Sequence, residues 1–494
     1  MKLSSSGTRV ARVARMGTAI AGLLVLASCG GGGDGGTPVS GGPGGFTPSS
    51  SVAQRCNLSD EKSWLRSWTD ETYLWYQDVR ALSTTTLNPL IYATPEDYFD
   101  VLKSPIVTAS GKKKDAYHFM YDTTAWIALS QSAVSYGYGF EIAQVAPTSP
   151  ALRKVLVAYT NAGTPAVTAG LARGAQVLTV DGIDVVNENT KVGLAALNAG
   201  LFPTAVGTHT FGVLDPGATV PRNVTLNAAA LSTPTVKNVK TLPAPNQNVG
   251  YMQFNDHLAT SEAELVTAVN QLKASGITEL MLDLRYNGGG YLDVAAELAF
   301  MIAGPTPTSG KTFEQEIYND KNPFGLSASQ TVTPFHSTAQ NFSLFDGRAL
   351  PSLNLSRVFV LVGAGTCSAS EAIVNGLRGV GVQVNLIGAT TCGKPYGFHP
   401  RDNCGTTYFS IQFQGVNQLG QGDYADGFLP TCAASDDFTH PLGDPAEGRL
   451  AAALSYRTTG VCAPVAKAQG AGVAALPEPT LMRTPLRENR IYRR

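Results

Sequence analysis

Apolar residues follow two distinct patterns through the second half of the chain. Residues 249–254 and 277–284 are nearly continuous apolar runs, typical of strands buried on both faces of a sheet. Residues 261–276 between them have helical spacing and begin with Ser-x-x-Glu, the form of a capping box. The alternation predicts an α/β domain over residues 236–460. Further strands are expected at 358–362 and 382–387, and further helices at 292–303 and 369–378.

An earlier stretch, residues 53–127, has a helical pattern. Trp64, Leu65 and Trp68 fall near one face at helical spacing, so we expect them to form a core face. Thr-Pro-Glu-Asp at 94–97 predicts a helix start, because Thr caps, Pro suits the first turn and acidic groups favour the helix N-terminus. These signals predict an N-terminal helical domain.

Residues 130–232 have the β-branched alternation and frequent Gly and Pro of a small β domain. Residues 137–142 read Gly-Tyr-Gly-Phe-Glu-Ile, a glycine turn that runs into a strand. Residues 169–182 give a turn, an apolar strand and an Asp-Gly turn. Residues 463–494 are rich in Ala, Pro and Arg without periodicity, and we expect them to be disordered.

The N-terminus has the form of a processing signal. A basic start, which ends at Arg15, precedes an apolar run at 17–27 that is too short to span a bilayer. Leu-Ala-Ser-Cys at 26–29 resembles a bacterial lipobox, in which Cys29 becomes the lipidated first residue of the mature chain. The alternative is an ordinary signal peptide with an incidental cysteine.

We therefore expect a lipoprotein signal peptide at 1–28, followed by a flexible Gly/Ser/Pro linker at 29–52. Because Gly30 stands where an Asp would favour the inner membrane, the lipobox resemblance implies the outer membrane. Acyl chains would hold the protein at the membrane without a spanning helix.

Charge and cysteine content narrow the possible functions. Lys and Arg total 36 against 37 Asp and Glu, so no basic surplus favours nucleic acid or anionic lipid. If Cys29 carries lipid, six of the seven cysteines remain, an even number that suits disulfides in an oxidising compartment. Their pairing stays open. The six histidines are scattered and no C-x-x-C pair exists, so neither a metal site nor a cofactor is expected.

Three segments that follow predicted strands carry candidate chemistry. Residues 283–290 read Asp-Leu-Arg-Tyr-Asn-Gly-Gly-Gly, a turn whose N–H groups could face developing negative charge. A tight turn without function or a phosphate loop is the alternative, and no Lys-Ser/Thr follows to favour the latter.

Residues 365–372, Gly-Thr-Cys-Ser-Ala-Ser-Glu-Ala, place Ser368 at a helix start, where it could equally be a cap. Residues 391–397, Thr-Cys-Gly-Lys-Pro-Tyr-Gly, contain Lys394, either a solvated surface charge or a base whose pKa is lowered by desolvation.

In order and spacing, these segments resemble the carboxy-terminal processing (tail-specific) serine proteases. The family pattern is Asp-Leu-Arg-x-Asn-x-Gly-Gly, then Ser-Ala-Ser-Glu, then Gly-Lys. The resemblance implies a Ser–Lys dyad in which Ser368 is the nucleophile and Lys394 the general base. It also implies that the backbone N–H groups of Ala369 and Gly289 form the oxyanion hole.

The resemblance extends over about residues 130–455. It implies a multidomain α/β protein with a PDZ-like β domain and a crotonase/Clp-like catalytic domain. In such a PDZ domain, Gly139 and Phe140 would bind a substrate's C-terminal carboxylate through backbone N–H groups. The implied partners are exported polypeptides in the bacterial periplasm.

Two positions depart from the family pattern, and two other functions remain open. Phe398 stands where the family often has Gln, which bears on the orientation of Lys394. Cys367 and Cys392 flank the catalytic positions and could form a disulfide there. A catalytically silent peptide-binding lipoprotein is one alternative function, and a hydrolase of non-peptide substrates is the other.

Overall fold

The structure is a computed structural model that describes residues 45–108, 110–145, 153–462, 478–482 and 490–492. The expected signal peptide, Cys29 and most of the linker lie outside the described residues. Every helix within them is too short or too polar to cross a lipid bilayer.

A six-stranded sheet forms the centre of the largest unit, in the order β21-β16-β15-β11-β10-β9. The strands from β10 to β21 run parallel, and β9 adds an antiparallel edge. Side chains on both faces are buried, as the continuous apolar runs predict. The strands are β9 (Val236–Thr241), β10 (Val249–Phe254), β11 (Glu279–Asp283), β15 (Arg357–Val362), β16 (Gln383–Gly388) and β21 (Cys432–Ala433).

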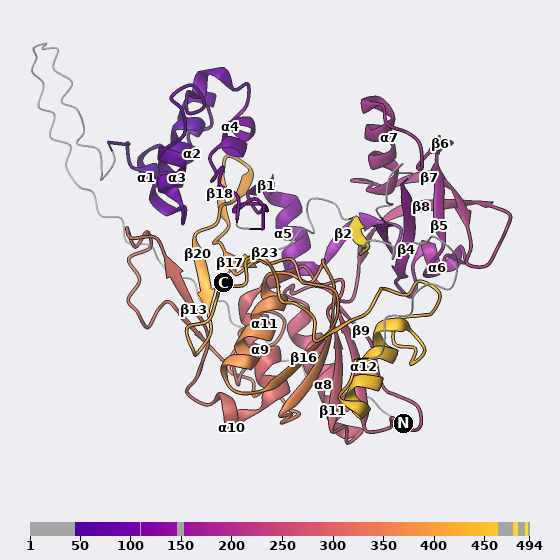
Figure 1. The fold of residues 1–494 in the computed structure, drawn as a ribbon. Helices are drawn as coiled ribbons and strands as arrows, with labels where there is room; N and C mark the ends of the chain where they lie inside the picture. The colour runs from indigo at the N-terminus through magenta and orange to yellow at the C-terminus, as the bar shows by residue number, and fades with distance from the viewer. Residues whose placement is uncertain (1–44, 109, 146–152, 463–477, 483–489, 493–494) are drawn as a thin grey trace, which may run out of the picture.

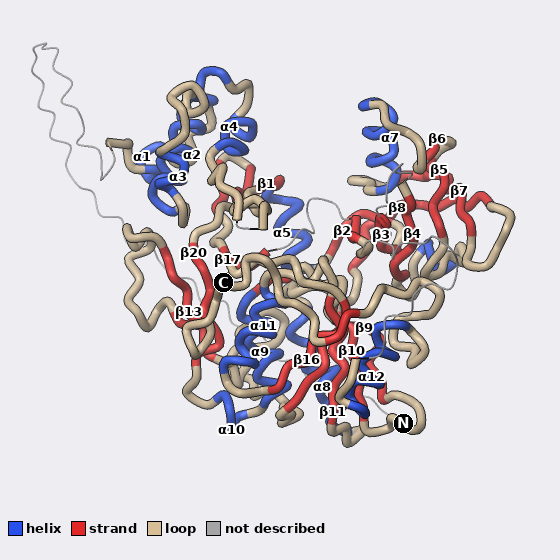
Figure 2. The backbone as a smooth tube through the Cα atoms, in the orientation of Figure 1, coloured by secondary structure: helices blue, strands red, loops and turns tan. Residues whose placement is uncertain are grey.

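Helices cover both faces of this sheet (Figures 1 and 2). On one face, α8 (Ser261–Ala274), α9 (Leu292–Ala303) and α11 (Ala369–Gly379) pack against alternate strand residues. On the other, α12 (Gly448–Thr459) packs through Leu450 and Ala453. The mixed α/β architecture and each element expected between 249 and 387 are confirmed within a few residues.

The start of α8 is right, but its expected capping box does not form. Ser261 Oγ accepts from the Leu258 N–H at 2.9 Å and donates to Asp256 O at 2.8 Å. Glu264 instead accepts from the N–H groups of Thr235 and Val236, at 2.7 and 2.9 Å. The motif therefore joins α8 to the start of β9 rather than capping the first turn of α8.

The N-terminal helical region is built as expected, and it does not stand apart. Trp64 and Trp68 stack in its core, and Thr94 caps α4 by accepting from the Asp97 N–H at 3.1 Å. Trp64 also packs on Tyr408, so this core is continuous with that of the α/β domain over residues 236–460. The helices are α1 (Ser49–Val52), α2 (Leu58–Thr72), α3 (Tyr76–Arg80), η1 (Pro89–Ile91), α4 (Pro95–Val101) and α5 (Thr123–Ser132).

The structure differs from the expectations for this region at two places. A turn of helix, α1, begins inside the range assigned to the flexible linker. Phe46 lies just before α1, and Arg66 lies over its ring at 4.4 Å, an aromatic contact that the Gly/Ser/Pro composition concealed. The region also contains a strand, β1 (Phe119–Asp122), which pairs with β19 (Thr406–Phe409); β19 pairs in turn with β18 (Arg401–Asn403).

A second small sheet lies beside α11 and holds the strand that follows Lys394. Its order is β14-β13-β20-β17, and all pairs are antiparallel. α10 (Pro305–Thr308) precedes it. The strands are β13 (Thr312–Tyr318), β14 (Val332–Pro334), β17 (Tyr396–Gly397) and β20 (Phe413–Val416).

The β domain expected at 130–232 is present and is called the β-rich unit here. Its strands run in the order β2-β8-β7-β5-β4-β3, with β6 beside β5, around a separate apolar core. In Figure 1 it forms the magenta lobe opposite the N-terminal helices. Its elements are β2 (Val134–Gly137), β3 (Phe140–Val145), β4 (Lys154–Thr160), α6 (Pro165–Thr168), β5 (Gln176–Val180), β6 (Ile183–Asp184), α7 (Lys191–Leu201), β7 (Gly207–Leu214) and β8 (Arg222–Ser232).

The expectation that all of 463–494 is disordered is wrong for two short strands. β22 (Thr480–Met482) pairs with β3, and β23 (Arg490–Tyr492) pairs in parallel with β12 (Gly289–Tyr291). Both are added to edges supplied by distant segments. Local composition carries no signal for such pairing.

Three disulfides join the six described cysteines. Cys56–Cys404 spans 348 positions and ties the N-terminal helices to β18 and β19. Cys432–Cys462 joins β21 to the residues after α12. Cys367–Cys392 lies at the candidate site and realises the pairing that the sequence left open.

Candidate active site

Ser368 lies in the turn between β15 and α11, as its N-cap residue. Its backbone has φ 63° and ψ −120°, a strained conformation for a residue with a Cβ. A serine held this way at a strand-to-helix turn is the arrangement of a nucleophile elbow. The side chain is buried, and its Oγ has no hydrogen-bond partner among the described residues. The N–H of Ala369 begins α11, where no intrahelical carbonyl is available to it.

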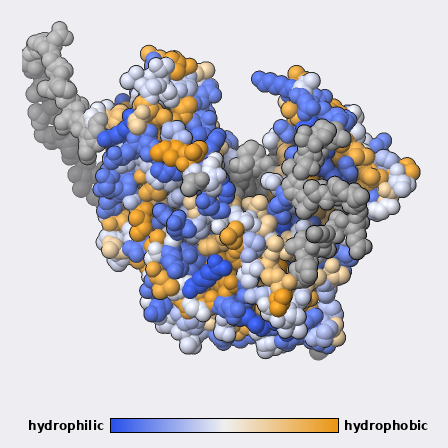
Figure 3. Space-filling view, viewed as in Figure 1, coloured by the Kyte–Doolittle hydropathy of each residue, from blue (hydrophilic) through white to orange (hydrophobic). Residues whose placement is uncertain are grey.

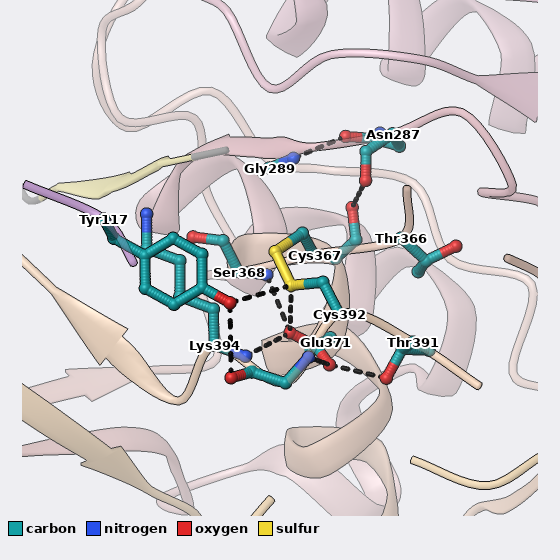
Figure 4. Close-up of a disulfide and its surroundings, with 12 residues drawn as sticks. Tyr117, Asn287, Gly289, Thr366, Cys367, Ser368, Glu371, Thr391, Cys392 and Lys394 are labelled. Carbon is teal, nitrogen blue, oxygen red and sulfur yellow. Dashed lines mark hydrogen bonds between the residues drawn. A yellow bond between two sulfur atoms is a disulfide. The ribbon is translucent and has the colours of Figure 1, made fainter. Parts of the chain in front are cut away.

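Glu371 joins the Ser368 turn to the Lys394 turn (Figure 4). One carboxylate oxygen, Oε2, accepts from the N–H groups of Ser368 at 3.0 Å and Lys394 at 2.8 Å. The other, Oε1, accepts from the Gly393 N–H at 2.9 Å and the Thr391 hydroxyl at 2.5 Å. Complete burial raises the pKa of Glu371, and the hydrogen bonds oppose part of that rise. Sequence reasoning saw only a capping residue here.

A disulfide makes the same connection covalently. Cys367 directly precedes Ser368, and Cys392 lies two residues before Lys394. Their Cα atoms are 5.2 Å apart. The two candidate catalytic turns are thus fixed together by a covalent bond and by a shared carboxylate.

The Lys394 side chain is buried among aromatic rings. Its Nζ lies 4.6 Å from the ring centre of Tyr117, 4.5 Å from that of Phe398 and 6.0 Å from that of Phe119. Phe398, the departure from the family pattern, therefore offers a ring face to Lys394 Nζ. Lys394 is not the surface charge that its Gly-Lys-Pro context would ordinarily indicate.

His399 lies five residues after Lys394 and is a second side chain that could act as a base, but it contacts different partners. Its Nε2 lies 2.8 Å from the Tyr318 hydroxyl, and its ring packs on Phe324 and Phe413. These residues belong to the β13–β20 sheet and the loop beyond it. The structure brings Lys394, rather than His399, to the Ser368 turn.

The glycine turn after β11 lies beside the serine turn, although one expected donor is already used. The Gly289 N–H donates to Asn287 Oδ1 at 2.9 Å, so it is not available to an oxyanion in this arrangement. Gly290 has φ 141°, and a Cβ there would come within 2.3 Å of His257 O, so only glycine fits. Burial lowers the pKa of His257 to about 4, and its neutral ring faces Asn287 Oδ1 at 3.1 Å. Cys367 N–H donates to Asn287 O at 3.1 Å, which links the two turns.

Arg285 of the same segment anchors a buried ion-pair network that the sequence did not predict. Its guanidinium contacts Glu447 at 2.6 Å and Asp436 at 2.8 Å. Asp436 also accepts from Arg173 of the β-rich unit at 2.6 Å, and Arg173 donates to the Tyr286 hydroxyl at 2.8 Å. Burial raises the pKa of Asp436, but the surrounding arginines outweigh it and hold the pKa well below its usual range. The network fastens the β-rich unit to the segment that leads into the glycine turn.

Gly139 and Phe140 lie where the glycine turn of the β-rich unit enters β3. Gly139 has φ 86°, and a Cβ there would overlap the side chain of Thr164 at 2.1 Å. A small cavity of about 60 Å³ adjoins this turn, with Met482 of β22 in its wall. The site residues thus fall into two groups, one at Ser368 and Lys394 and one at β3.

A larger cavity of about 1280 Å³ lies between these groups. Tyr117, Gly365 and Tyr286 line it near the serine turn, and Thr480 and Met482 line it near β3. Figure 3 shows the corresponding hollow between the N-terminal helices and the β-rich unit. An extended peptide could reach both groups from this space.

Cysteine and acidic side chains converge at two places in the described residues, but neither is suited to a metal. One group is Cys367, Cys392 and Glu371, and the other contains Cys56 and Cys404. Each pair of cysteines forms a disulfide and therefore offers no thiolate.

The sequence profile of Peptidase family S41 matches residues 248–403. A carboxyl-terminal-processing protease of Synechocystis is 29% identical over 233 residues, which cover 47% of this chain and 48% of that protein. A carboxyl-terminal-processing protease of Picosynechococcus is 28% identical over 232 residues, with 47% and 49% covered. The chain spans about half the length of these curated relatives.

A solved structure shares the fold. The crystal structure of a proposed S41 protease from Bacteroides fragilis aligns with a TM-score of 0.62 and 23% identity, covering 81% of this chain and 97% of that one. The residues that match the profile include all three motifs, at 283–290, 365–372 and 391–397. The chain therefore carries a peptidase family S41 domain at residues 248–403 and is similar to carboxyl-terminal-processing proteases.

Proposed function

We propose that this protein is a serine endopeptidase that cleaves exported polypeptides with a Ser368–Lys394 dyad. The observation that carries the proposal is the double connection between the two turns, through Glu371 and through Cys367–Cys392. The connection holds together the turn of a strained serine and the turn of a buried lysine, which supports their joint role in nucleophilic catalysis.

Each residue has a defined step in this reaction. Ser368 Oγ attacks the scissile carbonyl carbon while its proton passes to the neutral Lys394 amine. The N–H of Ala369 donates to the resulting oxyanion. Lys394 then gives its proton to the leaving amine, and the acyl-enzyme is hydrolysed by water. Gly289 would contribute a second donor only if its N–H turned away from Asn287.

The β-rich unit serves as a PDZ-like module in this proposal. A substrate C-terminus would pair with β3 and place its carboxylate at the N–H groups of Gly139 and Phe140. Amidation of the substrate C-terminus should then weaken binding about tenfold or more, since charge-assisted hydrogen bonds contribute about 1.5–3 kcal/mol each. Equal cleavage of free and amidated peptides would assign the unit a purely structural role. The lipidated Cys29 would hold the enzyme at the outer membrane, facing the periplasm.

Active-site labelling tests the catalytic part of the proposal. A fluorophosphonate probe should form an adduct on Ser368, located by peptide mass spectrometry, and Ser368→Ala should abolish both adduct and peptide cleavage. Ser329→Ala, at an exposed loop serine, is the matched control and should retain both. A folded chain that takes up no probe and cleaves no peptide would instead be a silent peptide-binding protein.

A further inference from the structure

The chain's own residues 478–482 lie on the strand edge that a peptide ligand would use. β4 occupies one edge of β3, and β22 occupies the other as an antiparallel strand. Thr480 lies opposite Gln144 and Met482 opposite Ile142, so the chain runs toward the Gly139 turn as it proceeds. This is the direction in which a bound C-terminus would point toward that turn.

Side chains hold β22 from both sides. Leu481 packs with Tyr159 and Tyr286, between the β-rich unit and the glycine-turn segment. Met482 faces the opposite way, into the core of the β-rich unit, as alternation along a strand requires. Glu478 pairs with the buried Arg449 of α12 and lies beside Gly363, which follows β15.

Residues 490–492 lie across the catalytic centre. β23 pairs with β12 from Gly289 to Tyr291, on the glycine turn (Figure 4). It also lies against β17, which begins two residues after Lys394. β23 therefore contacts a strand on each side of the site, β12 and β17, and Figure 1 shows β23 beside β17.

We propose that the described strands β22 and β23, in residues 478–482 and 490–492, are internal ligands of the peptide-binding path. The proposal rests on the proposed function, because β3 and β12 are the surfaces that a substrate would need. In this state the enzyme is self-occupied, and a substrate must displace the segment from both strand edges. Backbone pairing makes the exchange possible because a substrate strand offers the same hydrogen bonds.

Competition within one chain has a predictable size. A tethered segment acts at an effective concentration in the millimolar range. If its intrinsic dissociation constant is about tenfold lower, a substrate's apparent affinity falls by about tenfold. Removing the segment should raise the apparent affinity for the substrate by the same tenfold without changing the catalytic residues.

Three shortened chains separate the two contacts. A chain ending at residue 482 keeps β22 and loses β23, one ending at 477 loses both strands, and one ending at 492 keeps both as the matched control. For a short quenched peptide, kcat/KM should rise several-fold in the chain ending at 482 and remain unchanged in the control.

Binding is measured without catalysis, so that it stands apart from the proposed function. In a Ser368→Ala background, a fluorescent synthetic peptide of residues 478–492 should bind the chain ending at 477 about tenfold more tightly than the full chain. Leu481→Asp in the full chain should act in the same direction, and it covers the case in which loss of the Glu478–Arg449 pair prevents folding. Equal affinities in folded full-length, shortened and Leu481→Asp proteins would overturn the inference, whether or not the wild type cleaves peptides.

Discussion

Because both oxygens of Glu371 accept hydrogen bonds from the Ser368 and Lys394 turns, this carboxylate has little freedom to take another role. Its burial would be costly without those donors. Glu371, which the sequence indicates only as a capping residue, therefore holds in position the two turns that carry the proposed dyad. The same Ser-x-x-Glu motif at Ser261 neither caps its own helix nor joins the two turns of the site, because Glu264 accepts from the N–H groups of Thr235 and Val236.

The first prediction distinguishes Lys394 from His399 as the base. Lys394→Met preserves side-chain volume among the Tyr117 and Phe398 rings, and it should lower kcat/KM by about 10²–10⁴-fold, the usual contribution of a general base. Wild-type activity should rise with pH, with a midpoint above 6.5, the ordinary value for histidine. His399→Gln should retain most activity, because its ring contacts Tyr318 rather than the serine turn.

Kinetics across pH 5–10 on all three proteins check this prediction, with Lys311→Met as an exposed-lysine control. A His399 variant that loses activity while Lys394→Met keeps it would replace the base and leave Ser368 as the nucleophile.

A second prediction concerns stability in acid. Burial lowers the pKa of His118 to about 4 even though Asp115 lies 3.7 Å away, so the folded ring stays neutral where an unfolded one, with a pKa of 6.5, is protonated. The unfolded state then binds the extra proton between pH 6.5 and 4, and stability falls as pH falls through that window, by about 1.4 kcal/mol per pH unit. His257 adds a contribution of the same sign.

Urea midpoints from pH 7 to 4.5 should show this fall, and His118→Gln should reduce the slope by about one proton. His440 is exposed, and Asp437 raises its pKa, so His440→Gln serves as the control and should leave the fall in place. An unchanged slope in His118→Gln would mean that the ring is already charged when folded.

At the scale of elements, the position of a disulfide decides what it does. Cys367–Cys392 and Cys432–Cys462 close loops of similar length, 25 and 30 positions. Loop-closure entropy gives each about 3–4 kcal/mol of stability. Only the first joins the turns of Ser368 and Lys394.

The third prediction compares these two disulfides, which close loops of similar length. Replacing both cysteines of either pair by serine should lower stability by similar amounts. Cys367→Ser with Cys392→Ser should also reduce kcat by about tenfold or more, because small misplacements of reacting groups are costly. Cys432→Ser with Cys462→Ser should leave kcat near the wild-type value. Equal kcat in both double variants, measured below their unfolding transitions, would show that Glu371 alone suffices to hold the turns.

The sequence predicted β10, β11, β15 and β16 of the central sheet because burial on both faces leaves an uninterrupted apolar signal, but it predicted neither of the edge strands, β9 and β21. It also indicated Ser368 and Lys394, whose motifs are local. It assigned Glu264 the wrong partners and missed the roles of Arg173 and Asp436, since the groups that these side chains contact lie far away along the chain. It could not indicate that Asn287 takes the Gly289 N–H, which depends on one side-chain rotamer.

At the scale of the whole molecule, the expected division into successive domains is only partly useful. The β-rich unit has its own core, but the helices of the N-terminal region share theirs with β18, β19 and the central sheet. Domain limits drawn from changes in sequence pattern follow the order of the chain. Here, however, the N-terminal helices pack on β19, which lies far away along the chain.

A fourth prediction belongs to this scale because it concerns where the molecule is held. If Cys29 is the lipidated first residue, Cys29→Ala should release the protein from the membrane fraction or block processing after residue 28. Fractionation and intact-mass measurement of the purified chain check this, and an acyl mass on Cys29 is expected only in the wild type. Unchanged membrane retention in Cys29→Ala would leave an ordinary signal peptide as the explanation.

β1 pairs with β19, and the Cys56–Cys404 disulfide also ties the N-terminal helices to the β18–β19 turn. This arrangement has a consequence for biogenesis. A polypeptide that emerges N-terminus first cannot bury Trp64 against Tyr408 until nearly the whole chain has appeared. The first helices to emerge would therefore wait with exposed aromatic surface, a period in which chaperones and proteases compete for them. Vectorial delivery across a membrane would prolong that wait, so the yield of native protein should depend on how quickly residues 404–409 follow.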